Sequence, residues 1–201
     1  DKFSVSAWLK GWPADNYGAI VSKGGGTPIL GWKASHLTGD SDSGISLDYT
    51  YTTAINVNGS NKTINGVTFS GASGDSGHGW IRTEGFSSTH ASENSTVTGQ
   101  MGSMLSNGMR YNGDPQRIKL TGLTNGKSYV FSVYSQAYGS SGDRTCTLSS
   151  SDFSDSLTIN QNQYTSSSQD GLLIDCTYIA DGTEAEFTFD PSNSSATWHL
   201  Y

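Results

Sequence analysis

The chain has 201 residues, of which 33% are hydrophobic and 14% charged, and its formal net charge is −7. Phosphate binding needs clustered Lys and Arg, so nucleic acid is excluded as a partner. No apolar run reaches the roughly 20 residues that a membrane-spanning helix needs, so membrane insertion is not expected. The 25 glycines and many small polar residues favour short strands joined by turns. An acidic, Ser/Thr-rich surface is typical of soluble extracellular proteins, and we expect an extracellular or cell-surface location.

The N-terminal segment has the pattern of a β-hairpin. Residues 3–10 alternate apolar and polar side chains, and residues 19–23 form a second short run after a turn-rich loop. The segment resembles the central hairpin of laminin-G-like (concanavalin-A-like) domains. A lone hairpin forms no stable core in water. Residues 1–33 are therefore predicted to be a hairpin arm that packs on the β-sandwich domain at residues 34–201, or on another chain.

A polar stretch at residues 38–44 contains Asp40, Asp42 and Gly44, as at the start of a calcium loop. The EF-hand pattern fails, because the twelfth position counted from Asp40 is Tyr51 and not a glutamate. Two interpretations stay open, a structural calcium site that uses Asp40 and Asp42 or a plain polar turn. No other cofactor is indicated.

From Ile45 onward the chain is rich in strand patterns, which predict one antiparallel, jelly-roll-like β-sandwich. The clearest segment is residues 118–139, where two strand-like runs flank the turn signal Asn125-Gly126 and predict a hairpin. No long helix is expected. One helical turn is predicted where apolar residues recur at helical spacing, at Met101, Met104 and Leu105.

Within this segment, Tyr129, Phe131 and Val133 alternate onto one face, which predicts that they lie in the core with Leu123. The spacing of Leu123, Gly126 and Tyr129 resembles the tyrosine corner of fibronectin-like and immunoglobulin-like sandwiches. There a tyrosine hydroxyl is hydrogen-bonded back to the preceding turn. The alternative is an ordinary buried tyrosine.

The two cysteines, Cys146 and Cys176, both lie in strand-like runs. A disulfide between them would close a loop of about 30 residues and stabilise the fold by roughly 3–4 kcal/mol. The alternative is a pair of buried free thiols. A zinc site made of cysteines alone needs more ligands than these two.

Three stretches, INGVTF, LTGLTNGKSYVFSVYSQAYG and the closing TWHLY, resemble a β-sandwich module of large secreted or surface proteins from environmental bacteria. The general architecture is similar to galactose-binding-like jelly rolls, and the resemblance covers residues 38–201. It implies a fold and a location and does not imply an activity.

Residues 74–79, GDSGHG, share short motifs with chymotrypsin-like proteases and with one esterase family. The proteases expect a glycine where His78 stands, and the esterases expect an aspartate where Ala196 precedes His199 by three residues. A Gly/Ser turn is the preferred interpretation, and no enzyme is predicted. No two histidines stand at metal-ligand spacing, and we interpret all four as surface or site-rim residues, namely His36, His78, His90 and His199.

Aromatic residues in or beside turn-rich stretches are candidate ligand contacts, because sugar rings stack on flat aromatic faces. The competing interpretation is that each one anchors the core or a loop. The candidates are Trp12, Tyr17, Trp80, Tyr111 and Tyr138. Four Asn-x-Ser/Thr sequons are candidate glycosylation sites, at Asn58, Asn61, Asn94 and Asn193.

Two functional hypotheses follow. The first is a non-catalytic structural or adhesive subunit that assembles with other copies of itself into a surface fibre, by strand exchange through the N-terminal arm. The second is a carbohydrate-binding module of a larger secreted protein, which would have glycans as partners.

Overall fold

The structure, a computed structural model, describes residues 30–72, 74, 76–86, 88–90, 94–136, 143–164 and 169–201, with the side chains of residues 163 and 164 excepted. The predicted hairpin at residues 3–23 lies outside these ranges. So do Trp12, Tyr17 and Tyr138.

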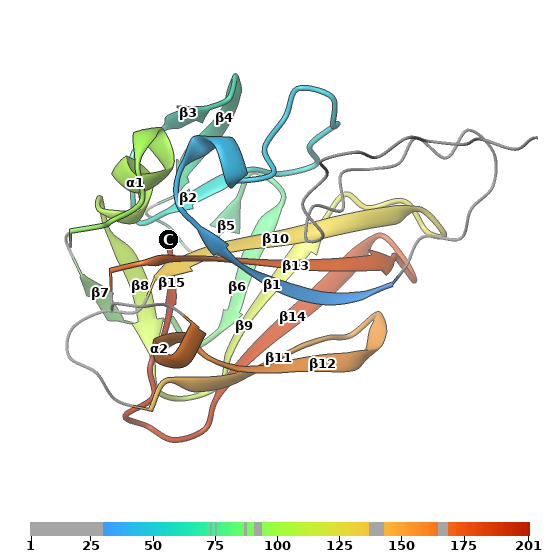
Figure 1. Ribbon diagram of the computed structural model, residues 1–201. Coiled ribbons are helices and arrows are strands. Elements are labelled where there is room, and N and C mark those ends of the chain that lie inside the picture. The colour runs from blue at the N-terminus through green and yellow to red at the C-terminus, as the bar shows by residue number, and fades with distance from the viewer. Residues whose placement is uncertain are drawn as a thin grey trace, which may run out of the picture.

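Strands make up most of the described chain (Figure 1). They are β1 (Gly31–Leu37), β2 (Ile55–Val57), β3 (Lys62–Ile64), β4 (Val67–Ala72), β5 (Ser76–Gly77), β6 (Trp80–Glu84), β7 (Ser88–His90), β8 (Met109–Asn112), β9 (Gln116–Thr121), β10 (Ser128–Gln136), β11 (Thr145–Ser150), β12 (Phe153–Asn160), β13 (Gly171–Ile179), β14 (Glu184–Pro191) and β15 (Trp198–Leu200). The helical elements are short, namely η1 (Asp40–Asp42), α1 (Gly99–Leu105) and α2 (Gln161–Tyr164). The prediction of an all-β fold is confirmed, and the jelly-roll strand order stays a prediction.

The strands form four sheets. A three-stranded sheet has the order β1-β13-β10, and a six-stranded sheet has the order β12-β11-β14-β9-β6-β5. Two smaller sheets also have three strands each, but shorter ones, in the orders β15-β8-β7 and β2-β4-β3. Nearly all pairings are antiparallel, and the exception in the described chain is β2 with β4.

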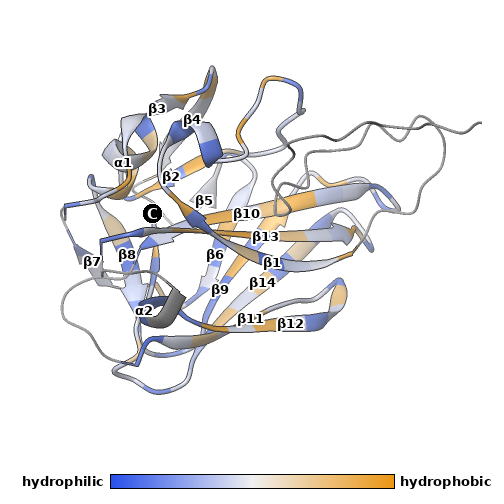
Figure 2. Cartoon of the chain, in the orientation of Figure 1, coloured by the Kyte–Doolittle hydropathy of each residue, from blue (hydrophilic) through white to orange (hydrophobic). Residues whose placement is uncertain are grey.

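The two larger sheets share one apolar core, and Figure 2 shows hydrophobic residues recurring along β10 and β13. Alternate residues of β13 and β14 supply about a third of its buried side chains, because successive side chains of a strand point to opposite faces. The predicted core positions Leu123, Phe131 and Val133 are all buried, and Tyr129 packs against the cluster. The core side chains from β13 and β14 are Leu172, Ile174, Cys176, Tyr178, Ala185, Phe187 and Phe189.

The predicted hairpin at residues 118–139 is wrong in its pairing. Strand β9 pairs with β14 and β6, whereas β10 pairs with β13 in the other large sheet. Six residues separate β9 from β10, which is longer than the two-residue loop that a tight hairpin uses. The turn therefore carries the chain from one sheet to the other, so that both strands face the same core from opposite sides.

A tyrosine corner closes this crossing turn, as predicted. The backbone N–H of Thr124 donates to the hydroxyl of Tyr129 at 2.9 Å. Gly126 has a φ of +77°, a backbone conformation that favours glycine. Its N–H donates to the carbonyl of Ala180 at 2.8 Å, which ties the turn to the end of β13.

A second apolar cluster covers the C-terminal half of β10. It lies on the opposite face from the main core, where Tyr134 and Leu173 meet α1 and the β3–β4 hairpin. The helical turn predicted around residues 101–105 is confirmed, because α1 buries Met101, Met104 and Leu105 against this face. Within the described ranges, no helix has the length and apolar composition that a bilayer crossing requires.

Strand β1 spans the position at which the sequence predicts a boundary between the N-terminal arm and the β-sandwich domain. It pairs with β13 from its first residue, with Gly31 opposite Thr177. Trp32 then closes one side of the two-sheet core, since its Nε1 donates to the carbonyl of Asp155 on β12 at 3.2 Å. Residues 31–33 therefore belong to the sheet, and the boundary predicted after residue 33 falls inside a strand.

The predicted disulfide is not formed. Cys146 and Cys176 are both buried free cysteines, on β11 of one large sheet and β13 of the other. Burial, the largest cause, raises the pKa of Cys176 to about 12 and raises that of Cys146 further, because the thiolate would lose its hydration. The two thiols act as small apolar core residues.

Replacing Tyr129 by Phe is expected to lower the free energy of unfolding by about 1 kcal/mol, because the N–H of Thr124 loses its partner. Urea denaturation would measure the change. The matched control is Tyr49→Phe, at a tyrosine that is 53% exposed, and it should have little effect. Equal effects of the two substitutions would contradict a stabilising role for the corner.

The thiols are expected to be unreactive in the folded protein, because almost no thiolate exists at neutral pH when the pKa lies this high. Titration with Ellman's reagent should detect both thiols after denaturation and neither before it. A reducing agent should leave the melting temperature unchanged. A drop in melting temperature on reduction would show that a disulfide supports the fold after all.

Candidate functional site

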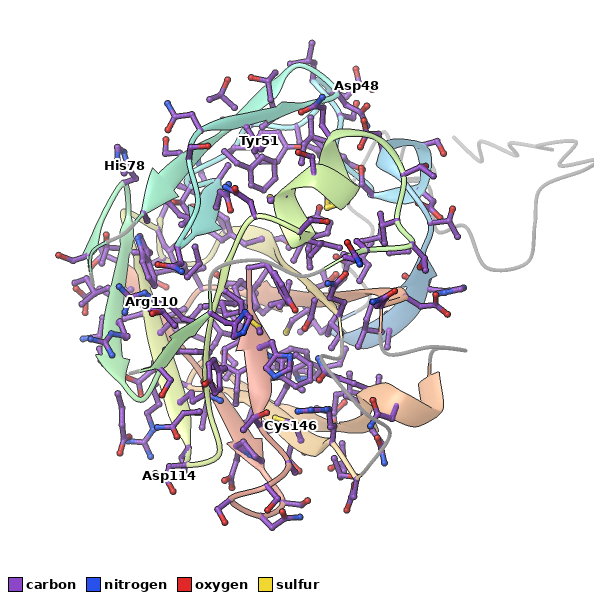
Figure 3. All side chains as sticks on the ribbon, turned by 90° about the vertical axis from the view of Figure 1, so that its left-hand side faces the viewer. Asp48, Tyr51, His78, Arg110, Asp114 and Cys146 are labelled. Atoms are coloured by element: carbon purple, nitrogen blue, oxygen red, sulfur yellow. The ribbon has the colours of Figure 1, made fainter. Side chains whose placement is uncertain are left out.

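A groove of about 320 Å³ lies between the loop before β2, strand β4 and the turn between β5 and β6. Figure 3 labels two of its lining residues, Tyr51 and His78, at the same end of the molecule. Hydroxyl groups dominate the lining, together with one aromatic ring and one imidazole. The lining residues are Tyr51, Thr52, Thr53, Ala54, Val67, Thr68, Ser70 and His78.

The loop on one side of the groove is held in shape by its own side chains. The Tyr51 hydroxyl donates to the carbonyl of Ser46 and accepts from its N–H, both at 3.0 Å. The Ser46 hydroxyl donates to the Asp48 carboxylate at 2.9 Å and accepts from the Asp48 N–H at 3.1 Å. The ring of Tyr51 is consequently fixed where it lines the groove, and the residue is 37% exposed.

The opposite side of the groove is tied to this loop. The hydroxyl of Thr53 donates to the carbonyl of His78. His78 has a φ of +50° and Gly79 a φ of +87°, so the two residues make a tight left-handed turn into β6. This turn places the exposed His78 beside the groove.

The groove offers hydrogen bonds and a flat ring, and its described lining includes no carboxylate. Hydroxyls of Thr68 and Ser70 can donate and accept, and the imidazole of His78 can do both through its two nitrogens. Val67 is buried and adds an apolar side chain to the lining. This set suits a small polyhydroxylated ligand.

The predicted ligand-contacting aromatics do not gather at one site. Trp80 is 2% exposed and lies in the main core, so its prediction as a ligand contact is wrong. The reason is its position, since it begins β6 and faces inward opposite Leu120 of β9. Tyr111 is half-buried on β8, where its ring meets the edge of the His199 ring with centroids 5.9 Å apart.

Sequence reasoning missed Tyr51 and His78 as neighbours. Tyr51 lies in the stretch from Ile45 onward whose pattern predicts strands, whereas the structure has no strand between Leu37 and Ile55. His78 lies in the motif GDSGHG, which is predicted to be a Gly/Ser turn. Within it, Ser76–Gly77 form β5, and residues 78–79 form the turn into β6. The sequence around Tyr51 shows only two tyrosines, Tyr49 and Tyr51, that alternate within a Thr-rich stretch. This pattern does not indicate that Tyr51 lies near His78.

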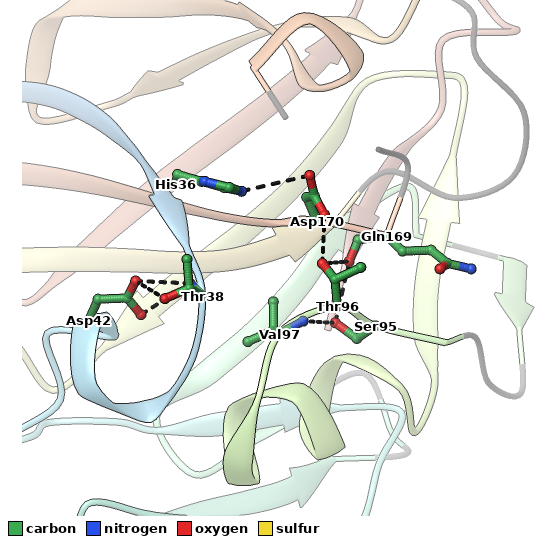
Figure 4. A network of polar contacts seen from close by, with 8 residues as sticks. All are labelled: His36, Thr38, Asp42, Ser95, Thr96, Val97, Gln169 and Asp170. Carbon is green, nitrogen blue, oxygen red and sulfur yellow. Dashed lines mark hydrogen bonds and ion pairs between the residues drawn. The ribbon is translucent and has the colours of Figure 1, made fainter. Parts of the chain in front are cut away.

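Asp40 and Asp42, the predicted calcium ligands, both accept backbone hydrogen bonds. The carboxylate of Asp40 accepts from the N–H of Gln100 and of Met101, at 3.0 and 2.7 Å, and so caps the start of α1. Asp42 accepts from the N–H and hydroxyl of Thr38 (Figure 4) and also from the N–H of Gly39. No group of three or more His, Cys, Asp or Glu side chains that could hold a metal occurs among the described residues. The calcium site stays a prediction.

A second polar network in Figure 4 links β1 to the loop before α1. His36 Nε2 lies 3.8 Å from a carboxylate oxygen of Asp170, and the Thr96 hydroxyl donates to the other oxygen at 2.6 Å. The carboxylate lies between imidazole and hydroxyl. A nucleophile relay instead needs the imidazole between the other two groups, so this arrangement joins chain segments without activating Thr96.

The four sequons differ in accessibility. Asn61, Asn94 and Asn193 are exposed. Asn58 is half-buried, and its amide donates to the carbonyls of His90 and Met109 at 3.5 and 3.4 Å. Glycosylation stays a prediction at all four. The amide nitrogen of Asn193 also has a protein partner, because it donates to the hydroxyl of Ser192 at 3.2 Å.

His199 is not a surface residue, contrary to expectation. It is 1% exposed, and its Nδ1 lies 3.2 Å from the carbonyl of Gln136. A carbonyl only accepts, so Nδ1 carries the proton and Nε2 accepts from Thr197 at 3.0 Å and Arg144 at 3.4 Å. Burial, aided by the nearby Arg144 charge, lowers the pKa of His199 to about 3. The imidazole is therefore a neutral structural link between β15 and β10.

The chain matches no family model, no curated protein and no solved structure.

The buried His199 predicts loss of stability in acid. The unfolded histidine takes up a proton at a pH of about 6.5, whereas the folded one resists until the pH is near 3. The neutral His199 therefore contributes its full stabilisation above pH 6.5. Below this pH the free energy of unfolding decreases, by about 3 kcal/mol at pH 4.5. Urea denaturation of the wild type and of His199→Gln across this range would measure it. The substituted protein should show a shallower pH dependence, and parallel curves would contradict the assignment.

Proposed function

We propose that this chain is a non-catalytic, extracellular glycan-binding β-sandwich module. The observation that carries the proposal is the groove in which Tyr51 and His78 meet a row of hydroxyl groups. Its volume of about 320 Å³ lies at the lower end of the range for small-molecule sites. It suits roughly one or two sugar units.

The lining chemistry supports a sugar over other small ligands. Tyr51 provides a flat ring for the apolar face of a sugar, and Thr68, Ser70 and His78 provide hydrogen bonds to its hydroxyls. The internal hydrogen bonds of the Ser46–Tyr51 loop hold the ring in place before a ligand arrives. Such preorganisation lowers the ordering cost of binding.

The proposal is for binding and not for cleavage. Glycoside hydrolysis uses a pair of carboxylates flanking the bond, and the described lining residues provide none. The resemblance to galactose-binding-like jelly rolls supports a sugar-binding role, and the acidic, Ser/Thr-rich composition supports an extracellular location.

Self-assembly through the N-terminal arm stays a second proposal. Its specific support is the continuous pairing of β1 with β13 from Gly31 onward, which joins the preceding residues directly to a sheet edge. The test is deletion of residues 1–29, which leaves β1 intact, followed by electron microscopy. Fibres that persist after the deletion would contradict the arm's role.

Tyr51→Ala is expected to weaken glycan binding at least tenfold, which corresponds to about 1.4 kcal/mol. Binding would be measured on an array of plant and algal polysaccharides and then by calorimetry with the best ligand. Tyr49→Ala is the matched control, since it removes an exposed ring from the same loop that is not among the groove lining. His78→Ala should also weaken binding.

Two outcomes would contradict the glycan proposal. One is a wild-type protein that binds none of the polysaccharides. The other is equal loss in Tyr51→Ala and Tyr49→Ala while circular dichroism shows both to be folded. Tyr51→Phe separates the ring from the hydroxyl that holds the loop, and it should retain most of the binding.

A further inference from the structure

Half of strand β10 is uncovered at the edge of its sheet. Residues 133–136 are all buried, with Val133 in the main core and Tyr134 in the second apolar cluster, and β15 and α1 pack against this half of the strand. In contrast, Ser128, Val130 and Ser132 are exposed, and Val130 is 59% exposed. Among the described residues, this first half of the strand pairs only with β13.

The other sheet edges of the described chain are short or closed. Strands β2, β3, β7 and β15 have three residues each, and β5 has two. The two longer edge strands, β1 and β12, contact each other and are joined by the Trp32–Asp155 hydrogen bond. Among the described edge strands, the first half of β10 is therefore the longest segment whose outer side has no neighbouring strand.

This edge also lacks the usual protection against pairing. Natural edge strands are blocked by Lys, Pro, inward charges or bulges. The sequence of β10, SYVFSVYSQ, contains no charged residue, proline or glycine, and its register with β13 is regular. It consists mainly of residues that favour strands, including Val, Tyr and Phe. Val130 forms an exposed apolar spot with Ile179, its diagonal neighbour on β13.

We propose that β10 pairs antiparallel with β10 of a second copy, about a two-fold axis at Val130. Such an interface joins the two three-stranded sheets into one of six strands. The axis falls at Val130 because this residue is the midpoint of the uncovered stretch Ser128–Ser132. Each Val130 then lies opposite its symmetry mate, which a two-fold interface requires.

The remaining pairs are also complementary. Tyr129 lies opposite Phe131 of the partner subunit on the core side, and Ser128 lies opposite Ser132 of the partner subunit on the solvent side. Aromatic pairs and hydroxyl pairs are both favourable across antiparallel strands. Two chains of net charge −7 repel each other, and an uncharged strand is a place where they can approach closely. Added salt should therefore strengthen the dimer.

The first test is the mass in solution, measured by light scattering and by sedimentation across a range of protein concentrations. The wild type should reach twice its 21.3 kDa. Val130→Lys should weaken the dimer by about tenfold or more, because two like charges would lie directly opposite each other. Ile81→Lys is the control, since it adds the same charge at a 37% exposed strand residue of the other large sheet, and it should leave the dimer unchanged.

The second test examines the register. Val130→Cys should form an intermolecular disulfide on mild oxidation, whereas Ile81→Cys should not, and both natural cysteines are buried. A wild type that stays monomeric at millimolar concentration would overturn the proposal. So would a Val130→Lys protein that dimerises as the wild type does, or a dimer that is lost on deletion of residues 1–29 but not with Val130→Lys, which would assign assembly to the arm.

Discussion

The contact of Phe131 with Phe187 is the interaction on which the rest of the structure depends. Their rings are stacked with centroids 3.8 Å apart, one from the three-stranded sheet and one from the six-stranded sheet. Tyr178 and Trp32 add edge-to-face contacts to Phe187, at 5.4 and 6.2 Å. Burying a phenylalanine side chain stabilises by about 2–3 kcal/mol. The sheets therefore meet through an aromatic centre, and the smaller sheets and loops are arranged around it.

The chain must cross between the two layers to build this centre, and polar side chains hold this crossing and the segments that pack around β10. Tyr129 holds the turn from β9 to β10, and Tyr134 donates from the far face of β10 to the carbonyl of Ser43 at 2.9 Å. His199 links β15 to β10, because its Nδ1 donates to the carbonyl of Gln136. Each polar group lies at the margin of an apolar cluster, where a buried donor or acceptor needs a partner.

The two proposed surfaces lie on different parts of this scaffold. The groove belongs to β4 of a small sheet and to the loops beside it, while the β10 edge belongs to the main core. Loops carried by a rigid core can change their side chains at little cost in stability. The separation means that ligand binding and pairing of two copies can operate independently, and a dimer would present two grooves.

Local patterns in the sequence determined the strand-rich class, the helical turn at Met101–Leu105, the inward face of Phe131 and Val133, and the tyrosine corner at Tyr129. These features depend on neighbours a few residues apart, which alternation and spacing report directly. Only the tertiary structure decided that β9 and β10 separate into two sheets, that Trp80 and His199 are buried, that the cysteines stay free, and that Tyr51 meets His78. Those outcomes depend on contacts between residues far apart in the chain, and a strand pattern shows which side of a strand is apolar without showing which strand lies opposite.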